Sequence, residues 1–288
     1  MVSCNYKTIN NAAIIGHFLS AVTMIFLYSD RPRVIIPLTE SYLEWRVANN
    51  TTSCPLGSRE FTTATGKFCV GTVTKPIYCD LSSKQCSGID LGWIIIVFHL
   101  LSFVFQLFAA VTDYTGPIYG YKYSDMIKSN KNPLRFIEYS ISASVMLIAI
   151  ALINGVTDIN LIISIGVLTG SCQLCGLAVE YVDDKPTKWL IHGIGWIQFL
   201  WAYGIIGYAF FKSVDASNQS GGITPPSFVY VIVFVLFALY SSFGFVQLAE
   251  LLTPLNPYTK ETTYVVLSLT AKLLLGWMIF SNVLLLGD

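Results

Sequence analysis

Long apolar stretches separated by polar segments run along the whole 288-residue chain. Seven of them hold about 20 predominantly apolar residues, the length that an α-helix needs to cross the hydrocarbon core of a bilayer. They cover residues 9–28, 91–111, 134–153, 159–179, 189–211, 228–252 and 263–286. Typical helix-boundary residues flank several of them: Asn132 and Pro133 open the third, Pro225 and Pro226 precede the sixth, and Pro254 and Pro257 follow it. The pattern predicts an all-α membrane protein, a single seven-helix bundle over residues 1–288 with its termini on opposite sides of the membrane.

The composition agrees with an integral membrane protein. Hydrophobic residues make up 54% of the chain and charged residues 12%, and the mean hydropathy is +0.61. So few charges cannot cover a soluble globule of this size, and membrane lipid is the expected partner of the surface. The net charge is zero and no basic arm occurs, so nucleic acid is not an expected partner. The first apolar stretch lacks an A-x-A-like exit, so we expect a membrane span there rather than a cleaved signal peptide.

The connecting segments predict the orientation in the membrane. Residues 29–90 are polar and contain overlapping glycosylation sequons at Asn49 and Asn50, so they are expected to form an extracellular loop. A further sequon, at Asn218, falls on the same side. Lysines gather in the segments of the other side, as expected of a cytoplasmic face: Lys7, Lys122, Lys128, Lys131, Lys185, Lys188 and Lys260. The N-terminus is therefore predicted to be cytoplasmic and the C-terminus extracellular, the reverse of G-protein-coupled receptors and ordinary microbial rhodopsins.

The extracellular loop is predicted to be stapled by disulfides. Its four cysteines allow three pairings, among which the sequence does not choose: Cys54, Cys69, Cys79 and Cys86. Alternation over residues 59–78 around Thr65 and Gly66 indicates a small hairpin. A cap over the helix bundle is favoured over a ligand-binding domain. Cys172 and Cys175 lie inside the fourth stretch, where we expect small packing residues rather than a metal or redox pair.

One full positive charge, Lys272, interrupts the last apolar stretch. About ten residues of helix, roughly 15 Å, separate it from the start of that stretch. A lysine side chain cannot snorkel so far to the headgroups. An unpaired charge at this depth would cost about 2.5–3.5 kcal/mol on insertion scales. Lys272 therefore needs a partner or a chemical modification.

Glu138 is the carboxylate nearest to the interior of a span, and Ser142 follows it one helical turn later on the same face. The third and seventh stretches run in the same direction, and helical side chains lean toward the helix N-terminus. The Lys272 amine and the Glu138 carboxylate are therefore expected at similar depths. A buried ion pair that only holds two helices together is one interpretation, and a functional site is the other.

The residues around this pair resemble the heliorhodopsin family. The third stretch contains Arg135-x-x-Glu138-Tyr-Ser-x-Ser-Ala-Ser-x-Met146, and the seventh contains Ser268-x-x-Ala-Lys272-x-x-Leu-x-Trp277. The inverted orientation is a hallmark of that family, and the resemblance covers all seven spans. The long first loop with four cysteines is a departure from it. The resemblance implies that Lys272 carries retinal, all-trans in the dark, as a protonated Schiff base, and that Glu138 is the counterion.

The resemblance also implies the remaining site residues. Ser268 would lie one turn from the linkage, and the other expected residues of the retinal site are Ser142, Met146, Trp196, Tyr240 and Gln247. His17 and His99 match polar positions inside the bundle and are candidates for accepting a proton, although a buried histidine is more often structural. From the resemblance alone we also expect a homodimer.

The distribution of carboxylates favours a light sensor over a pump. A pump needs acid and base groups on both sides of the Schiff base, but Glu138, Glu180 and Glu250 lie toward the cytoplasmic ends of their spans, and the outer halves contain no carboxylate. We expect a slow conformational change that a cytoplasmic signalling partner reads. Light-gated passive proton or ion conduction, with Glu180 and Glu250 in a cytoplasmic route, is the alternative. A receptor without a chromophore and an enzyme are both disfavoured, the latter because no nucleophile–base set accompanies the spans.

Overall fold

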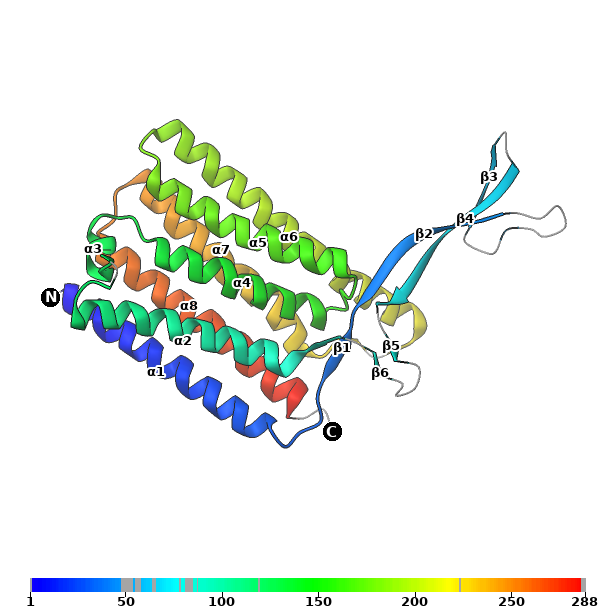
Figure 1. Ribbon diagram of the computed structural model, residues 1–288, viewed down its shortest axis with the longest axis horizontal. Coiled ribbons are helices and arrows are strands. Elements are labelled where there is room, and N and C mark those ends of the chain that lie inside the picture. Colours follow the sequence, from blue (N-terminus) through cyan, green and yellow to red (C-terminus); the bar gives the residue numbers. More distant parts are fainter. Residues whose placement is uncertain are drawn as a thin grey trace.

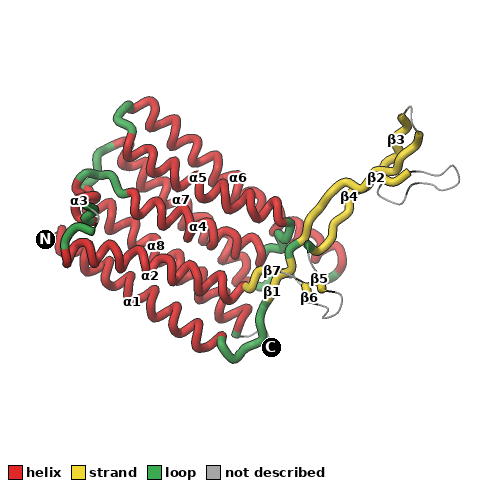
Figure 2. Tube along the Cα trace, viewed as in Figure 1, coloured by secondary structure: helices red, strands yellow, loops and turns green. Residues whose placement is uncertain are grey.

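The computed structural model of the protein describes residues 2–47, 54, 58–63, 66–77, 79–80, 85–86, 88–118, 120–222 and 224–285. Within these residues, seven long apolar helices form a bundle, and a group of strands projects from one of its ends (Figures 1 and 2). The helices are α1 (Val2–Tyr28), α2 (Leu91–Thr115), α4 (Pro133–Ile153), α5 (Ile159–Tyr181), α6 (Lys185–Ser220), α7 (Ser227–Leu252) and α8 (Pro257–Ile279). The number of spans predicted from the sequence is confirmed.

The two ends of the bundle differ in the segments that connect the helices. The short helix α3 (Tyr123–Lys128) lies at the end where α1 begins, which we call the α3 end. The strands lie at the other end, which we call the strand end, and there α8 continues into a π-helical turn, η1 (Phe280–Leu284). The first residues of α1 and the last residues of η1 thus lie at opposite ends of the bundle.

Side-chain caps fix where most of the helices begin. Asp90 accepts hydrogen bonds from the backbone of Gly92 and Trp93 at the start of α2, and the caps of four other helices are Asn132, Asp158, Asp184 and Asn256. Such residues accept bonds from backbone N–H groups that the first helical turn leaves unpaired. Pro133 is the first residue of α4 and α7 ends at Leu252, both as predicted.

The predicted ends of three helices were wrong. α1 begins at Val2 rather than at residue 9. α6 continues to Ser220 instead of ending at residue 211, because nothing in its polar last turns breaks a helix until Gly221, whose φ of 66° suits a left-handed C-cap. The sequon at Asn218 therefore lies on a helix and not in a loop. α8 begins at Pro257 rather than at residue 263, since Asn256 caps a polar first turn. This earlier start brings Lys260 and Glu261 into the helix.

The segment between α1 and α2 contains most of the strands. The hairpin predicted over residues 59–78 is confirmed: β3 (Arg59–Thr63) pairs antiparallel with β4 (Gly66–Pro76), and Thr63 lies opposite Gly66. A longer ladder between β2 (Thr39–Val47) and β4 was not predicted. β1 (Ile35–Pro37) pairs with β7 (Gly88–Asp90) where the segment joins the bundle. The all-α class thus holds for the membrane part, while the first loop is a β arm.

Two of the four loop cysteines, Cys54 and Cys69, form a disulfide in the described part of the chain. Cys79 and Cys86 are backbone partners in the short ladder of β5 (Cys79–Asp80) and β6 (Gln85–Cys86). Their side chains lie outside the described residues, as do Asn49 and Asn50. The sheet of β2, β3 and β4 extends away from the bundle, while β1, β7, β5 and β6 lie near its end (Figures 1 and 2), so β2, β3 and β4 do not form the cap that the sequence suggested.

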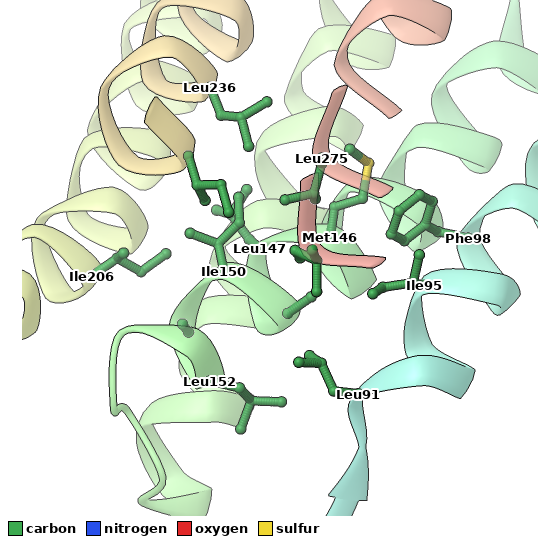
Figure 3. Packing of buried hydrophobic residues seen from close by; sticks show 14 of the residues in the cluster. Leu91, Ile95, Phe98, Met146, Leu147, Ile150, Leu152, Ile206, Leu236 and Leu275 are labelled. Carbon is green, nitrogen blue, oxygen red and sulfur yellow. The ribbon is translucent and has the colours of Figure 1, made fainter. Parts of the chain in front are cut away.

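The apolar core occupies the half of the bundle toward the strand end. Figure 3 shows side chains of α2, α4, α6, α7 and α8 meeting there, and each of the following is at most 3% exposed: Leu91, Ile95, Phe98, Met146, Leu147, Ile150, Leu152, Ile206, Leu236 and Leu275. Between lipid-embedded helices such close packing, rather than exclusion of water, supplies much of the attraction. The buried charged groups described below lie outside this core.

Candidate functional site

Lys272 lies inside the bundle and contacts a carboxylate and a hydroxyl. Its side chain is 3% exposed, and its Nζ forms an ion pair with Oε1 of Glu138, whose side chain is 5% exposed. Nζ also donates to Oγ of Ser102 on α2, and Ser102 donates to the same Glu138 oxygen over 2.7 Å. The structure therefore brings Lys272 and Glu138 together as the depth comparison predicted. A buried charge is tolerated when it is paired and hydrogen-bonded in this way.

A cavity begins at this ion pair and extends between the helices. Its first part is lined by Lys272, Ser142, Met146 and Ser268. Its second part is lined by Trp196, Gln247 and several further aromatic residues. Both parts share four lining residues, Tyr139, Gln173, Tyr240 and Phe243, so they are neighbouring portions of one elongated space. All seven residues that the sequence assigned to a cofactor site besides Glu138 line this space.

Aromatic side chains build the walls of the second part. The rings of Trp196 and Phe199, which both line it, lie 5.8 Å apart, and Phe245 packs on Trp196 from outside the cavity at 5.2 Å. Trp196 also packs against Gly244, where an added Cβ would come within 2.6 Å of the indole ring. Cys172 and Cys175 face the same space with free thiols. Such a concave, mostly apolar site with a few polar groups is typical of a site for a small organic molecule.

His17 and His99 form a buried pair next to this site. Their Nδ1 atoms lie 3.0 Å apart, so one ring carries its proton on Nδ1 and the other accepts it. His99 precedes Ser102 by one turn of α2, and it packs against Gly276, one turn beyond Lys272 on α8, so closely that an added Cβ would lie 2.5 Å from Nε2. The pair thus borders the Lys272 site on its strand-end side.

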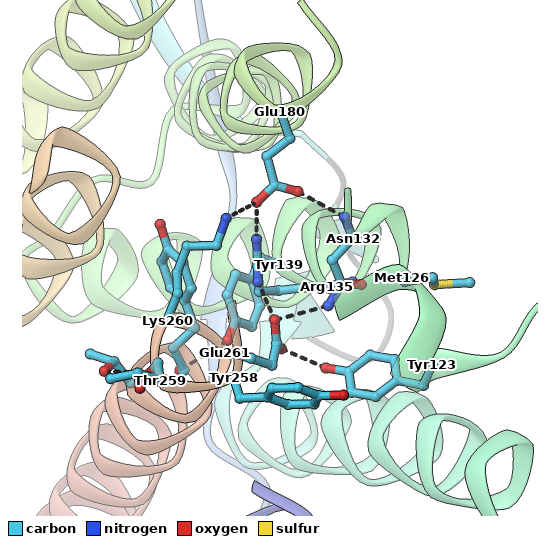
Figure 4. Close-up of polar contacts among 12 residues, drawn as sticks. Tyr123, Met126, Asn132, Arg135, Tyr139, Glu180, Tyr258, Thr259, Lys260 and Glu261 are labelled. Carbon is cyan, nitrogen blue, oxygen red and sulfur yellow. Dashed lines mark hydrogen bonds and ion pairs between the residues drawn. The ribbon is translucent and has the colours of Figure 1, made fainter. Parts of the chain in front are cut away.

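Four charged residues form a second buried cluster at the α3 end, which we call the inner ion cluster: Arg135, Glu180, Lys260 and Glu261 (Figure 4). Arg135 of α4 bridges Glu180 of α5 and Glu261 of α8, and Lys260 reaches Glu180 over 3.0 Å. The four side chains are between 2% and 6% exposed. Two cations and two carboxylates cancel, which makes such deep burial tolerable. Arg135 precedes Glu138 by one helical turn, so the cluster adjoins the Lys272 site.

The inner ion cluster also holds α3 against the bundle. Tyr123, the first residue of α3, donates to Glu261 over 2.5 Å. Burial and the neighbouring Glu261 carboxylate keep the pKa of Tyr123 well above its ordinary value, so its hydroxyl remains a donor. Asn132 donates to both carboxylates, through its side chain to Glu261 and through its backbone to Glu180. A change in the charge of this cluster would therefore reach a segment at the surface of the bundle.

Glu180 and Glu250, the two carboxylates of the expected cytoplasmic route, have different hydrogen-bond partners. Glu180 belongs to the inner ion cluster, whereas Glu250 accepts hydrogen bonds from Asn130 and from the backbone of Leu255 in two connecting segments.

Within the described part of the chain, no group of three or more histidine, cysteine or carboxylate side chains could hold a metal ion.

Sequence reasoning missed three polar residues of the site. Ser102 is a single hydroxyl residue in an apolar stretch, so nothing in the sequence marks it as part of a site. Glu261 lies just before residue 263, where the seventh span was predicted to begin. His192 lines the second part of the cavity beside Trp196 and Gln247. Of these three, only Glu261 could have been found from the sequence. Asn256 is a typical N-cap residue, and a helix that starts there includes Glu261 at the same end of the bundle as Glu180.

Comparison with known proteins places the chain in a family. No curated protein matches it. The family model described as Heliorhodopsin matches residues 6–284, which is nearly the whole chain and includes all seven spans. The members of this family are rhodopsins, multi-pass membrane proteins that bind retinal and respond to light, and they are not an enzyme class in the ordinary sense. The resemblance predicted from the motifs around Glu138 and Lys272 is therefore confirmed, and the chain belongs to the heliorhodopsin family.

Proposed function

We propose that Lys272 carries all-trans retinal as a protonated Schiff base and that Glu138 is its counterion. The observation that carries this proposal is the burial of the Lys272 amine at the end of an aromatic cavity, in contact with a carboxylate. A primary amine is the side-chain group that condenses with an aldehyde, and an anion close by keeps the resulting imine protonated. Ser102 holds the same Glu138 oxygen, so it orients the counterion.

The cavity fits an elongated polyene. It runs from Lys272 to the far residues His192 and Gln247, and aromatic rings form most of its walls. Three buried hydroxyl oxygens in those walls, Ser142 Oγ, Tyr240 Oη and Ser268 Oγ, have no hydrogen-bond partner among the described residues, as expected where a bound molecule completes the packing. Retinal, when bound, supplies light absorption and a twist from the all-trans to the 13-cis form. The protein residues hold the proton near Glu138 and restrict which part of the polyene has room to turn.

We infer that the α3 end faces the cytoplasm and the β arm lies outside. The lysines of the short segments gather at the α3 end, and the Cys54–Cys69 disulfide lies in the arm at the other. An N-terminal tag should therefore be inaccessible to antibody in intact cells, while protease should cleave the arm. Arm cleavage only after permeabilisation would reverse this orientation.

Among light-driven functions, we propose a sensor whose signal appears at the α3 end. The support is that Glu138 lies one helical turn from Arg135 of the inner ion cluster on α4, and that Glu261 of the cluster pairs with Arg135 and accepts a hydrogen bond from Tyr123 of α3. A homodimer and a cytoplasmic partner that reads α3 belong to this proposal. Passive proton conduction is the second candidate, because inner carboxylates could supply half of a route.

Voltage-clamped cells that express the protein separate the two functions. A sensor gives no sustained photocurrent at zero driving force, while its photocycle is long, at the slow end of collective motions or beyond. Steady photocurrents that reverse with the proton gradient would replace the sensor by a conductor, and neutralising Glu180 or Glu261 would then locate the route. Current that persists against the gradient would contradict both functions and require a pump.

A further inference from the structure

His192 contacts two residues that line the second part of the cavity. It lies on α6, one turn before Trp196, and is 6% exposed. The indole Nε1 of Trp196 lies 2.9 Å from Nε2 of His192, and Nδ1 of His192 lies 3.2 Å from Oε1 of Gln247 on α7. Nε2 of Gln247 lies 2.9 Å from the carbonyl oxygen of Gly176 on α5. These three hydrogen bonds form a chain that joins α5, α6 and α7.

The groups at the two ends of this series of hydrogen bonds determine which atom is the donor in each bond. An indole N–H can only donate, so Nε2 of His192 accepts and carries no proton. A neutral imidazole then carries its proton on Nδ1, which donates to Oε1 of Gln247. At the other end a carbonyl oxygen can only accept, so the amide of Gln247 must turn its NH2 group toward Gly176. Both arguments give the same orientation of Gln247, and the chain is consistent only when His192 is neutral with its proton on Nδ1.

The chain holds side chains that form the wall of the cavity. Trp196 is confined on one side by Gly244, whose missing Cβ leaves room for the indole ring. The hydrogen bond from Nε1 fixes the remaining freedom of that ring within its plane. Gln247 is held at both ends of its amide group, so its dipole points in one direction. Without His192 the indole N–H and the amide oxygen would each lose a partner, which is costly for buried groups.

We propose that His192, as the neutral Nδ1-protonated tautomer, is a positioning residue that sets the orientation of Trp196 and Gln247 at the end of the retinal cavity remote from Lys272. The role in retinal binding rests on the proposed function. The geometry assigns to His192 no contact with the reacting end of the chromophore, since it lines only the second part of the cavity. It acts through the two side chains that it holds, and its loss should change the colour of the pigment as well as its formation.

The first test addresses the tautomer and does not need retinal. Nitrogen NMR of protein labelled at the histidine ring nitrogens, with His192→Gln used to identify the signal, should show Nδ1 protonated and Nε2 unprotonated at neutral pH. The vibrational band that reports hydrogen bonding of the indole N–H of Trp196 should change in His192→Leu and stay unchanged in His192→Gln, whose amide oxygen can accept from Trp196. A proton on Nε2 of His192 would overturn the proposal.

The second test uses the colour and the formation of the pigment. We expect His192→Leu to shift the absorption maximum and to slow formation of the pigment with all-trans retinal roughly tenfold, because two buried polar groups lose their partner. His192→Gln should restore both, since its amide oxygen accepts from Trp196 and its NH2 donates to Gln247. Equal effects of leucine and glutamine, or no spectral change with leucine, would overturn the proposal. A colourless wild-type protein would contradict the proposed function instead, and the NMR result would still decide the tautomer.

Discussion

Replacing Arg135 by methionine should strongly destabilise the bundle, because it removes the cation between two buried carboxylates. Arg135 forms ion pairs with Glu180 and Glu261, and its side chain is 2% exposed. The guanidinium also lies 4.3 Å from the ring centre of Tyr264. Methionine keeps much of the apolar volume, so the loss is mainly electrostatic. Breaking a buried pair from one side costs about 3–5 kcal/mol, and we expect a loss of that size in the free energy of unfolding.

A second substitution separates charge from packing. Glu261→Gln in the Arg135→Met background leaves Lys260 and Glu180 as a balanced pair, so the double variant should lose less than the sum of the two single losses, by about 1–3 kcal/mol. The matched control is Lys128→Met, because Lys128 pairs with Asp125 over 3.5 Å while both side chains are more than 60% exposed. Its effect should stay within about 0.5 kcal/mol.

The free energies are measured by reversible unfolding in mixed micelles, followed by circular dichroism and tryptophan fluorescence. If Arg135→Met were no more destabilising than Lys128→Met, the ion pairs of Arg135 would not stabilise the bundle. Strict additivity of Arg135→Met and Glu261→Gln would show that the two residues do not act on each other.

Three further predictions test other parts of the structure. Glu138→Gln should red-shift the absorption or lower the pH at which the Schiff base loses its proton, because the imine loses its anion; an unchanged spectrum and titration would place the counterion elsewhere. Gly244→Val should hinder pigment formation, since its Cβ would collide with Trp196, and normal pigment yield and colour would contradict that packing. Reduction of Cys54–Cys69, which closes a loop of about 15 residues, should destabilise the arm by roughly 3 kcal/mol and increase its cleavage by protease without changing the absorption. A spectral change on reduction would show that the arm touches the site.

The number of spans and the central pair were predictable from the sequence for identifiable reasons. A membrane span requires a long apolar run whatever its tertiary neighbours are, so all seven appear in the hydrophobic pattern. Lys272 stood out because a charge is rare in such a run. The direction of the spans then limited its partners to carboxylates at the same depth, and Glu138 meets that condition in the structure.

The remaining features depend on contacts that a hydrophobic pattern does not contain. The last turns of α6 are polar and read as a loop, although local hydrogen bonds keep them helical up to Gly221. Strand β2 pairs with β4 about 30 residues further along the chain, so no local signal marks it. Glu261 was excluded with the polar first turn of α8, and the inner ion cluster remained invisible without it. Ser102 and His192 are single polar residues whose partners come from other helices.

The proposed function depends above all on whether Lys272 carries the chromophore. Protein produced with all-trans retinal should be coloured, and borohydride reduction in the light should fix retinal to the peptide that contains Lys272. Lys272→Ala should remain colourless although it still folds, which circular dichroism checks. Adding a retinal-derived Schiff base of a small alkylamine to Lys272→Ala should restore colour, since the cavity and Glu138 remain in place. A coloured Lys272→Ala protein without the added amine would contradict the central claim, because the chromophore would then be held by another residue.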